Sequence, residues 1–216
     1  MHEPSPQTTP DEKARGTRAR RILVGVMVAF ILIPLVAGLV RDRIRAAQHT
    51  GLQLAAAQTT LPADFESKLA GLGLTLPPPP AAIGAYVPSV RTGNLLFIAG
   101  TLPLVDGKVS HSGKVTADPE GIRHGYDAAR QCALNSLANI KAALGSLDRV
   151  SRIVSVTGFV NGTDNFPDSP KVINGASELF LAVFGDAGRH ARAAVSVNGL
   201  PLKASVEITV IVEVRE

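Results

Sequence analysis

The sequence has little of what many enzyme and nucleic-acid-binding classes depend on. Its 216 residues include one cysteine, Cys132, and no tryptophan, and only 4% are aromatic. A single cysteine excludes an intrachain disulfide and a cysteine-based zinc site. No Gly-x-Gly-x-x-Gly, P-loop or His-Glu-x-x-His motif is present, so nothing supports nucleotide or metal chemistry. We therefore expect neither a metal nor an organic cofactor.

Acidic residues are nearly missing from one basic stretch of the chain. The net charge is +4, yet eight of the 22 lysines and arginines lie between Lys13 and Arg45, where Asp42 is the one acid. This clustering is typical of a membrane-flanking segment. After residue 63 the charge is scattered, and no aromatic platform for stacked bases is evident. We therefore expect no nucleic-acid partner.

Residues 22–40 are a run of 19 residues without a charge. As a helix this run is about 28 Å long, close to the ~30 Å hydrocarbon thickness of a bilayer. A cleaved signal peptide and a buried core helix are the alternatives. The run is long for the first, and for the second it is too uniformly apolar with arginines at both ends. It predicts a single-pass transmembrane helix that attaches the protein to a membrane.

The residues on either side of this run predict the neighbouring segments and the orientation in the membrane. Residues 1–21 are polar and basic and are expected to be disordered, and residues 41–64 form a linker. Five lysines and arginines precede the run in residues 2–21, and three follow it in residues 41–60. The positive-inside rule therefore favours a cytoplasmic N-terminus and an extracytoplasmic catalytic domain, with the opposite orientation left open.

Residues 65–216 have the pattern of an α/β domain. Asp118 is an expected N-cap, Pro119 occupies the first helical position, and the helix that follows ends at Gly145. Apolar periodicity predicts further helices at 65–72 and 171–184, and strands at 95–99, 152–160, 192–197 and 206–214. This order predicts a sandwich in which two main helices cover one face of a mixed sheet.

The last two predicted strands alternate between aliphatic and polar residues. Val195 and Val197 share one face of the first strand, and Arg192 lies on the other. In the second strand, five aliphatic residues from 206 to 214 lie opposite Glu207. We expect the two valine faces to be buried together. If residues 199–204 form a hairpin loop, Arg192 and Glu207 lie on the same face of the sheet, although the sequence does not fix the register.

Three blocks of sequence together resemble a known family. They are residues 82–103 (Ala-Ile-Gly-Ala-Tyr to Gly-Thr-Leu-Pro), 171–180 (Lys-Val-Ile-Asn-Gly-Ala-Ser-Glu-Leu-Phe) and 192–208 (Arg to Val-Glu-Ile). In order and spacing they resemble the RidA/YjgF reactive-intermediate (enamine/imine) deaminases. The resemblance implies a chorismate-mutase-like fold and a homotrimer with sites between subunits. It also implies hydrolytic deamination of 2-imino acids to 2-keto acids and ammonia without a cofactor.

The resemblance also implies the site residues. Arg192 corresponds to the arginine that binds the substrate carboxylate, because a planar guanidinium matches a carboxylate with two parallel donors. Glu207 would orient water and shuttle protons. Tyr86 would form an edge of the pocket, Gly100 would let backbone approach the ligand, and Asn174 would support the local loop. Judged alone, each has a plainer interpretation. Arg192 would be a solvated charge or part of an ion pair, and Glu207 would pair with Arg192 or with a neighbouring basic residue. The other three would be a core tyrosine, a strand-end turn and a helix hydrogen bond.

The sequence differs from the family pattern at two positions, and it leaves two alternative functions open. Ala194 stands where many members have cysteine, and Ala99 where many have serine before the glycine. The chief alternative is a trimeric module that binds 2-keto acids without turnover. RNA cleavage, the family's older label, has the least support because the domain lacks a basic surface interleaved with aromatics. We interpret His111, His124 and His190 as surface or locally hydrogen-bonded residues.

Overall fold

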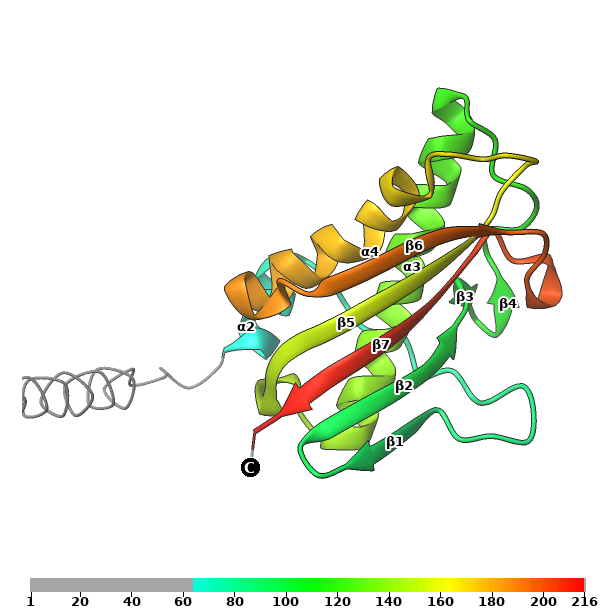
Figure 1. Cartoon of the computed structure of the whole chain (residues 1–216). Helices are drawn as coiled ribbons and strands as arrows, with labels where there is room; N and C mark the ends of the chain where they lie inside the picture. Colours follow the sequence, from blue (N-terminus) through cyan, green and yellow to red (C-terminus); the bar gives the residue numbers. More distant parts are fainter. Residues whose placement is uncertain (1–63, 216) are drawn as a thin grey trace, which may run out of the picture. The chain divides into compact units, whose positions relative to one another are not determined.

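One mixed β-sheet organises the chain, and two long helices cover one of its faces (Figure 1). The computed structural model describes residues 64–215. The sheet contains β1 (Ser89–Thr92), β2 (Leu95–Thr101), β5 (Val150–Asn161), β6 (Ala191–Val197) and β7 (Val206–Val214). The helices are α2 (Phe65–Gly71), α3 (Pro119–Leu144) and α4 (Ser169–Phe184), and a small hairpin pairs β3 (Leu104–Val105) with β4 (Lys108–Val109).

The strand order is β1-β2-β7-β5-β6. Strand β6 runs parallel to β5, and every other neighbouring pair in this sheet is antiparallel. Helix α3 packs against β7 and β2, and α4 packs against β5 and β6. The prediction of a mixed sheet with two main helices on one face is confirmed.

Helix α3 begins and ends where its sequence predicts. The Asp118 carboxylate accepts hydrogen bonds from the backbone N–H groups of Glu120 and Gly121, at 3.1 and 2.9 Å. These bonds satisfy donors that have no partner inside the helix. Gly145 ends the helix at a φ of 82°, a left-handed conformation that favours glycine. Local capping chemistry therefore fixes both ends of the longest element.

The core lies between the sheet and the two helices. Alternate residues of β7 point toward the helices and are buried, as predicted. The backbones of α3 and α4 touch, because a Cβ atom on Gly175 would collide with the carbonyl oxygen of Tyr126. The largest fully buried side chains are those of Leu96, Leu137, Ile140, Leu147, Ile153, Ile173, Leu179, Phe180 and Ile208. This packing leaves the opposite face of the sheet uncovered within the described chain.

The predicted burial of the valine face of β6 is wrong. Strand β5 lies between β6 and β7, so the two C-terminal strands do not pair. The connection between them crosses the end of β5, where the Asn161 N–H donates to the Ser205 carbonyl oxygen at 2.9 Å. As a result Ala194 packs against the core, and Val195 on the opposite face is 45% exposed.

The predicted transmembrane helix at 22–40 lies outside the described residues. So do the predicted disordered segment at 1–21 and nearly all of the linker at 41–64. Within residues 64–215, no helix combines the length and apolar character that a membrane crossing requires. The anchor and its orientation therefore stay predictions.

Candidate active site

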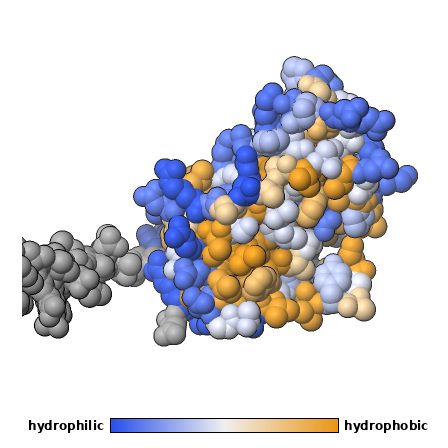
Figure 2. Space-filling model, in the orientation of Figure 1, coloured by the Kyte–Doolittle hydropathy of each residue, from blue (hydrophilic) through white to orange (hydrophobic). Residues whose placement is uncertain are grey.

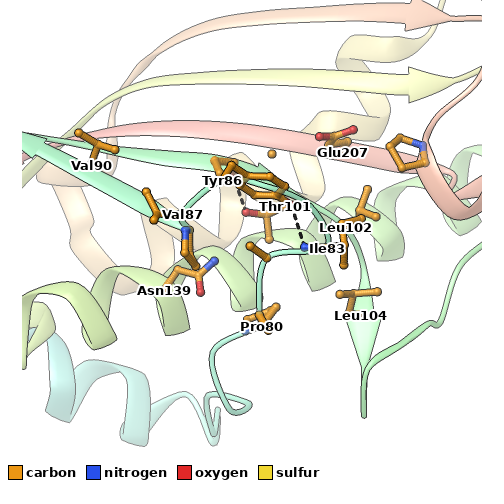
Figure 3. A pocket seen from close by; sticks show the side chains of 16 residues that line it. Pro80, Ile83, Tyr86, Val87, Val90, Thr101, Leu102, Leu104, Asn139 and Glu207 are labelled. Carbon is orange, nitrogen blue, oxygen red and sulfur yellow. Dashed lines mark hydrogen bonds between the residues drawn. The ribbon is translucent and has the colours of Figure 1, made fainter.

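A cavity of about 670 Å³ opens beside the C-terminal end of β2 (Figure 3). Its walls come from the segment 80–90, from β2 and the residues after it, from α3, and from the start of β7. Three of the predicted site residues line it: Tyr86, Gly100 and Glu207. The structure thus brings these three together.

Glu207 lies directly over Gly100. A Cβ atom on Gly100 would collide with Glu207 Oε1, so only glycine leaves room for the carboxylate in this position. The ladder between β2 and β7 is irregular between Ile98 and Thr101, which places Gly100 out of the regular pairing. Burial raises the pKa of Glu207 above its ordinary value of 4.5. A carboxyl with a raised pKa can both accept and return a proton near neutral pH.

Tyr86 stands at the wall of the cavity and does not belong to the core. Its phenol oxygen accepts a hydrogen bond from the Ile83 N–H at 3.3 Å, which closes a short turn (Figure 3). The side chain is 47% exposed, so the core interpretation of this tyrosine is wrong. The turn carries both residues onto the cavity rim.

Arg192 lies elsewhere, in a polar depression beside α4. Its Nη1 donates to Asn174 Oδ1 at 2.8 Å and to Ser177 Oγ at 3.1 Å. Both acceptors come from one face of α4, three residues apart. Arg192 forms no salt bridge within residues 64–215, so the ion-pair interpretation with Glu207 is wrong. Among residues 64–215 its other donors have no hydrogen-bond partner, so they can bind an anion.

Two residues of this depression were missed from the sequence. His190 Nδ1 lies 2.6 Å from the carbonyl oxygen of Gly188, so this nitrogen carries the proton and donates it. His190 Nε2 then accepts from the Ser177 hydroxyl at 3.0 Å, which leaves the Ser177 oxygen to accept from Arg192. Burial, and next the charge of Arg192, lower the pKa of His190. The interpretation of His190 as a locally hydrogen-bonded residue holds for its bond to Gly188, but residue spacing gives no sign of its contact with Ser177.

The two groups of site residues lie on opposite faces of the sheet within one chain. Arg192 pairs across the sheet with Val156, which points toward the helices. Glu207 pairs with Phe159, and Phe159 pairs with the exposed Val195. Residues paired across a sheet share a face, so the expectation that Arg192 and Glu207 share one is wrong. The physical reason is the insertion of β5 between their strands.

Other reactive side chains do not line the cavity or the depression, or are buried. Cys132 lies inside the core with Sγ 3.6 Å from the Val206 carbonyl oxygen, and burial, with a smaller contribution from Glu207, raises the pKa of its thiol. The rings of His111 and His124 lie 5.2 Å apart near the start of α3. Residues 64–215 contain no group of three or more histidine, cysteine, aspartate or glutamate side chains that could hold a metal ion.

Comparison with known proteins assigns the domain to a family. Residues 66–214 match the family described as "YjgF/chorismate mutase-like, putative endoribonuclease". Protein TCP17 of Trypanosoma cruzi is 42% identical over 150 residues, which cover 69% of this chain and 93% of that protein. The 2-iminobutanoate/2-iminopropanoate deaminase of Escherichia coli K12 is 35% identical over 133 residues, which cover 61% and 89%.

The solved structures agree on the fold. The crystal structure of a protein of unknown function from Agrobacterium tumefaciens has a TM-score of 0.63 at 43% identity. The match covers 70% of this chain and 92% of that one. With the family match over residues 66–214, these similarities mean that the chain belongs to the YjgF/RidA family and has its chorismate-mutase-like α/β fold.

Proposed function

We propose that the protein hydrolyses reactive 2-imino acids and their enamine tautomers to 2-keto acids and ammonia. The observation that carries this proposal is the partly buried carboxyl of Glu207, held over Gly100 at the wall of a cavity. A relative 35% identical over 133 residues is a 2-iminobutanoate/2-iminopropanoate deaminase. The reaction adds one water to the C=N carbon and releases the nitrogen.

Glu207 acts as the proton carrier in this reaction. Its carboxylate takes a proton from water while the oxygen bonds to the imine carbon. It returns that proton to the nitrogen, which gives a carbinolamine. It then takes the proton of the new hydroxyl group and delivers it to the nitrogen while the C=O bond forms and the C–N bond breaks, so the products are a keto acid and ammonia. The raised pKa of Glu207 suits both steps. Because a free imine is already electrophilic, positioning of water and substrate supplies much of the acceleration.

Arg192 binds the substrate carboxylate, and it does so at a site shared between subunits. Within one chain Arg192 and Glu207 lie on opposite faces of the sheet, so one small substrate requires two copies of the chain to meet both. In a homotrimer each site would combine Arg192 of one subunit with Glu207 of its neighbour. The hydrogen bonds from Asn174 and Ser177 hold the guanidinium for this contact.

The open face of the sheet supports this assembly. Apolar residues gather on the face that the helices leave uncovered (Figure 2). Val90, Phe97 and Val195 lie there and are 56%, 40% and 45% exposed. Exposed apolar surface of this kind marks sites of protein association. Burying it between three copies would remove it from water.

The experiment is complementation between two inactive variants of the full-length chain. Arg192→Ala and Glu207→Gln subunits, carrying different tags, are co-expressed and mixed trimers are isolated through both tags. In isolated mixed trimers about one third of the shared sites, one of the three in each trimer, regain an intact Arg192 and an intact Glu207, whichever variant is in excess. Ammonia release should recover to about that fraction of wild type.

The outcomes separate the possibilities. Recovery in mixed trimers, with none in either variant alone, supports a shared catalytic site. No recovery in isolated mixed trimers contradicts the shared site. If the wild-type protein binds 2-keto acids in calorimetry and never accelerates imine hydrolysis, the protein is the non-catalytic binding module instead.

Attachment to a membrane is a separate part of the proposal, resting on the uncharged run at 22–40. Full-length protein should sediment with membranes and resist extraction by alkaline carbonate. A version that begins at residue 61 should remain in the supernatant. Recovery of intact full-length protein in the soluble fraction would contradict the anchor.

A further inference from the structure

The cavity beside Glu207 is large for the smallest substrates of the proposed reaction. Its volume of about 670 Å³ lies within the range of pockets that bury drug-sized ligands, roughly 300–1,000 Å³. A 2-imino acid derived from alanine carries only a methyl group beyond its reacting atoms. Within one subunit such a substrate would leave most of the cavity unfilled, and water there would lie against apolar walls.

The walls are suited to an apolar side chain. Ile83, Val87, Leu102 and Leu104 project into the space around Tyr86 (Figure 3). Prolines and alanines fill most of the remaining lining: Pro80, Ala81, Ala82, Pro88, Ala99 and Pro201. Desolvating such walls favours a ligand in proportion to the apolar area that it covers.

One polar atom in the cavity wall lacks a partner. Asn139, from α3, lines the cavity and is 7% exposed. Its Oδ1 is buried and has no hydrogen-bond partner among residues 64–215. In Figure 3 Asn139 lies at the lower left and Glu207 at the upper right, with Tyr86 and Thr101 drawn between them. A buried acceptor without a partner is unfavourable, so a donor supplied by a ligand would stabilise it.

We infer that the cavity selects 2-imino acids whose side chain is large and apolar and ends in a hydrogen-bond donor, such as a hydroxyphenyl or indole group. The reacting carbon lies at Glu207, the side chain extends along the apolar walls, and its terminal O–H or N–H donates to Asn139 Oδ1. This inference rests on the proposed deaminase function and adds its substrate class.

The expected preferences follow from burial and hydrogen bonding. Each additional buried methylene raises kcat/KM about four-fold, so the leucine-derived imine should exceed the alanine-derived one by on the order of 50-fold. The tyrosine-derived imine should exceed the phenylalanine-derived one by about ten-fold, because only the former supplies a donor to Asn139.

The first measurement is a substrate panel on the full-length protein. The imines are generated in the cuvette from alanine, leucine, phenylalanine and tyrosine by an amino-acid oxidase, and their hydrolysis is followed. Failure to hydrolyse any imine overturns the proposed function. Hydrolysis with equal or greater kcat/KM for the alanine-derived imine overturns this inference and leaves the proposed function intact.

The second measurement uses Asn139→Leu, which keeps the branched shape of the side chain and removes the acceptor. The ratio of kcat/KM for the tyrosine- and phenylalanine-derived imines should fall from about ten to one or below. The ratio for phenylalanine over alanine should stay high, because the apolar walls are unchanged. An unchanged tyrosine-to-phenylalanine ratio in folded protein contradicts the role of Asn139.

Two neighbouring residues of the β3–β4 hairpin provide a matched pair for the apolar walls. Leu104 lines the cavity, whereas Val105 is 45% exposed and does not line it. Leu104→Ser should lower the leucine-to-alanine ratio about ten-fold, and Val105→Ser should leave it unchanged. Equal effects of both substitutions, or no effect of Leu104→Ser on the ratio, would show that the side chain does not occupy this cavity.

Discussion

The Glu207 cavity and the Arg192 depression differ in shape, polarity and construction. The cavity is lined mainly by apolar side chains, many of them from the segment 80–90. The depression beside α4 is lined mainly by polar and charged residues held in a hydrogen-bonded chain. In the cavity, burial raises the pKa of the Glu207 carboxyl. In the depression, the exposed guanidinium of Arg192 is oriented by hydrogen bonds to the neutral side chains of Asn174 and Ser177.

Each region suits one task of the proposed reaction: the cavity suits proton exchange, and the depression suits binding of the substrate carboxylate. A carboxyl that must exchange protons benefits from a partly dry site, because burial brings its pKa closer to neutral. A guanidinium that must bind a carboxylate benefits from a fixed orientation and free donors. The structure separates the two requirements onto opposite faces of the sheet, and four predictions test that separation.

The largest effect is expected at Arg192. Arg192→Ala removes the two-pronged carboxylate contact and should lower kcat/KM on the order of 10³-fold, with loss of 2-keto acid binding. Arg192→Lys should rescue little, since an ammonium cannot reproduce the planar geometry. Ammonia release and calorimetric titration with a keto acid are the measurements. Normal activity of Arg192→Ala would mean that the depression takes no part in the reaction.

Substitution of Glu207 should lower kcat and leave the affinity for a keto acid unchanged. Glu207→Gln keeps the shape of the side chain over Gly100 and removes the proton carrier. We expect kcat to fall roughly 10²-fold while the Kd for a keto acid changes little. Stopped-flow imine hydrolysis alongside calorimetry checks this. A parallel loss of binding would assign Glu207 a role in holding the ligand instead.

Ser177 should act through Arg192. Ser177→Ala removes the acceptor at 3.1 Å from Arg192 Nη1 and should raise KM about ten-fold with kcat nearly constant. Ser110→Ala is the matched control, since Ser110 Oγ also lies within hydrogen-bond distance of a histidine, 2.9 Å from His111 Nδ1, outside the depression. Equal effects of the two substitutions would contradict a positioning role. Ser177→Thr, which retains the hydroxyl, should restore KM.

The smallest effect concerns stability and pH at Glu207. Its folded-state pKa is raised above 4.5, so the folded protein binds the proton more tightly than the unfolded chain does. Wild-type stability therefore falls as pH rises from about 4.5 through the raised value. Glu207→Gln should raise Tm by about 1–2 °C at pH 7 and by nothing below about pH 4.5. Thermal melts across pH 4–8 measure this, and a pH-independent difference would exclude burial of the charge as its cause.

Local chemistry made much of the fold predictable. Asp118 and Gly145 specify the ends of α3 through bonds to neighbouring residues, so their sequence suffices. The alternation in β7 likewise corresponds to one buried and one open face. Strand β1 was not predicted, because three of its four residues are exposed and show no alternation.

Long-range pairing explains the errors. The residues between β6 and β7 are few enough for a hairpin, and nothing in them indicates that β5 separates the two strands. The sequence therefore indicated Arg192 and Glu207 as site residues and misplaced them relative to each other. The Ser177–His190 contact depends on the chain turning back after α4, which residue spacing alone does not reveal.

The burial of Cys132 has a practical consequence for labelling. It is the chain's single cysteine, it is fully buried, and its thiol is held in the protonated form, which is unreactive toward maleimides. The folded surface therefore offers no competing thiol. A fluorophore attached through Val105→Cys, in the β3–β4 hairpin, would sit at one chemically defined position. Distances between such labels can then test the proposed assembly without first removing a cysteine.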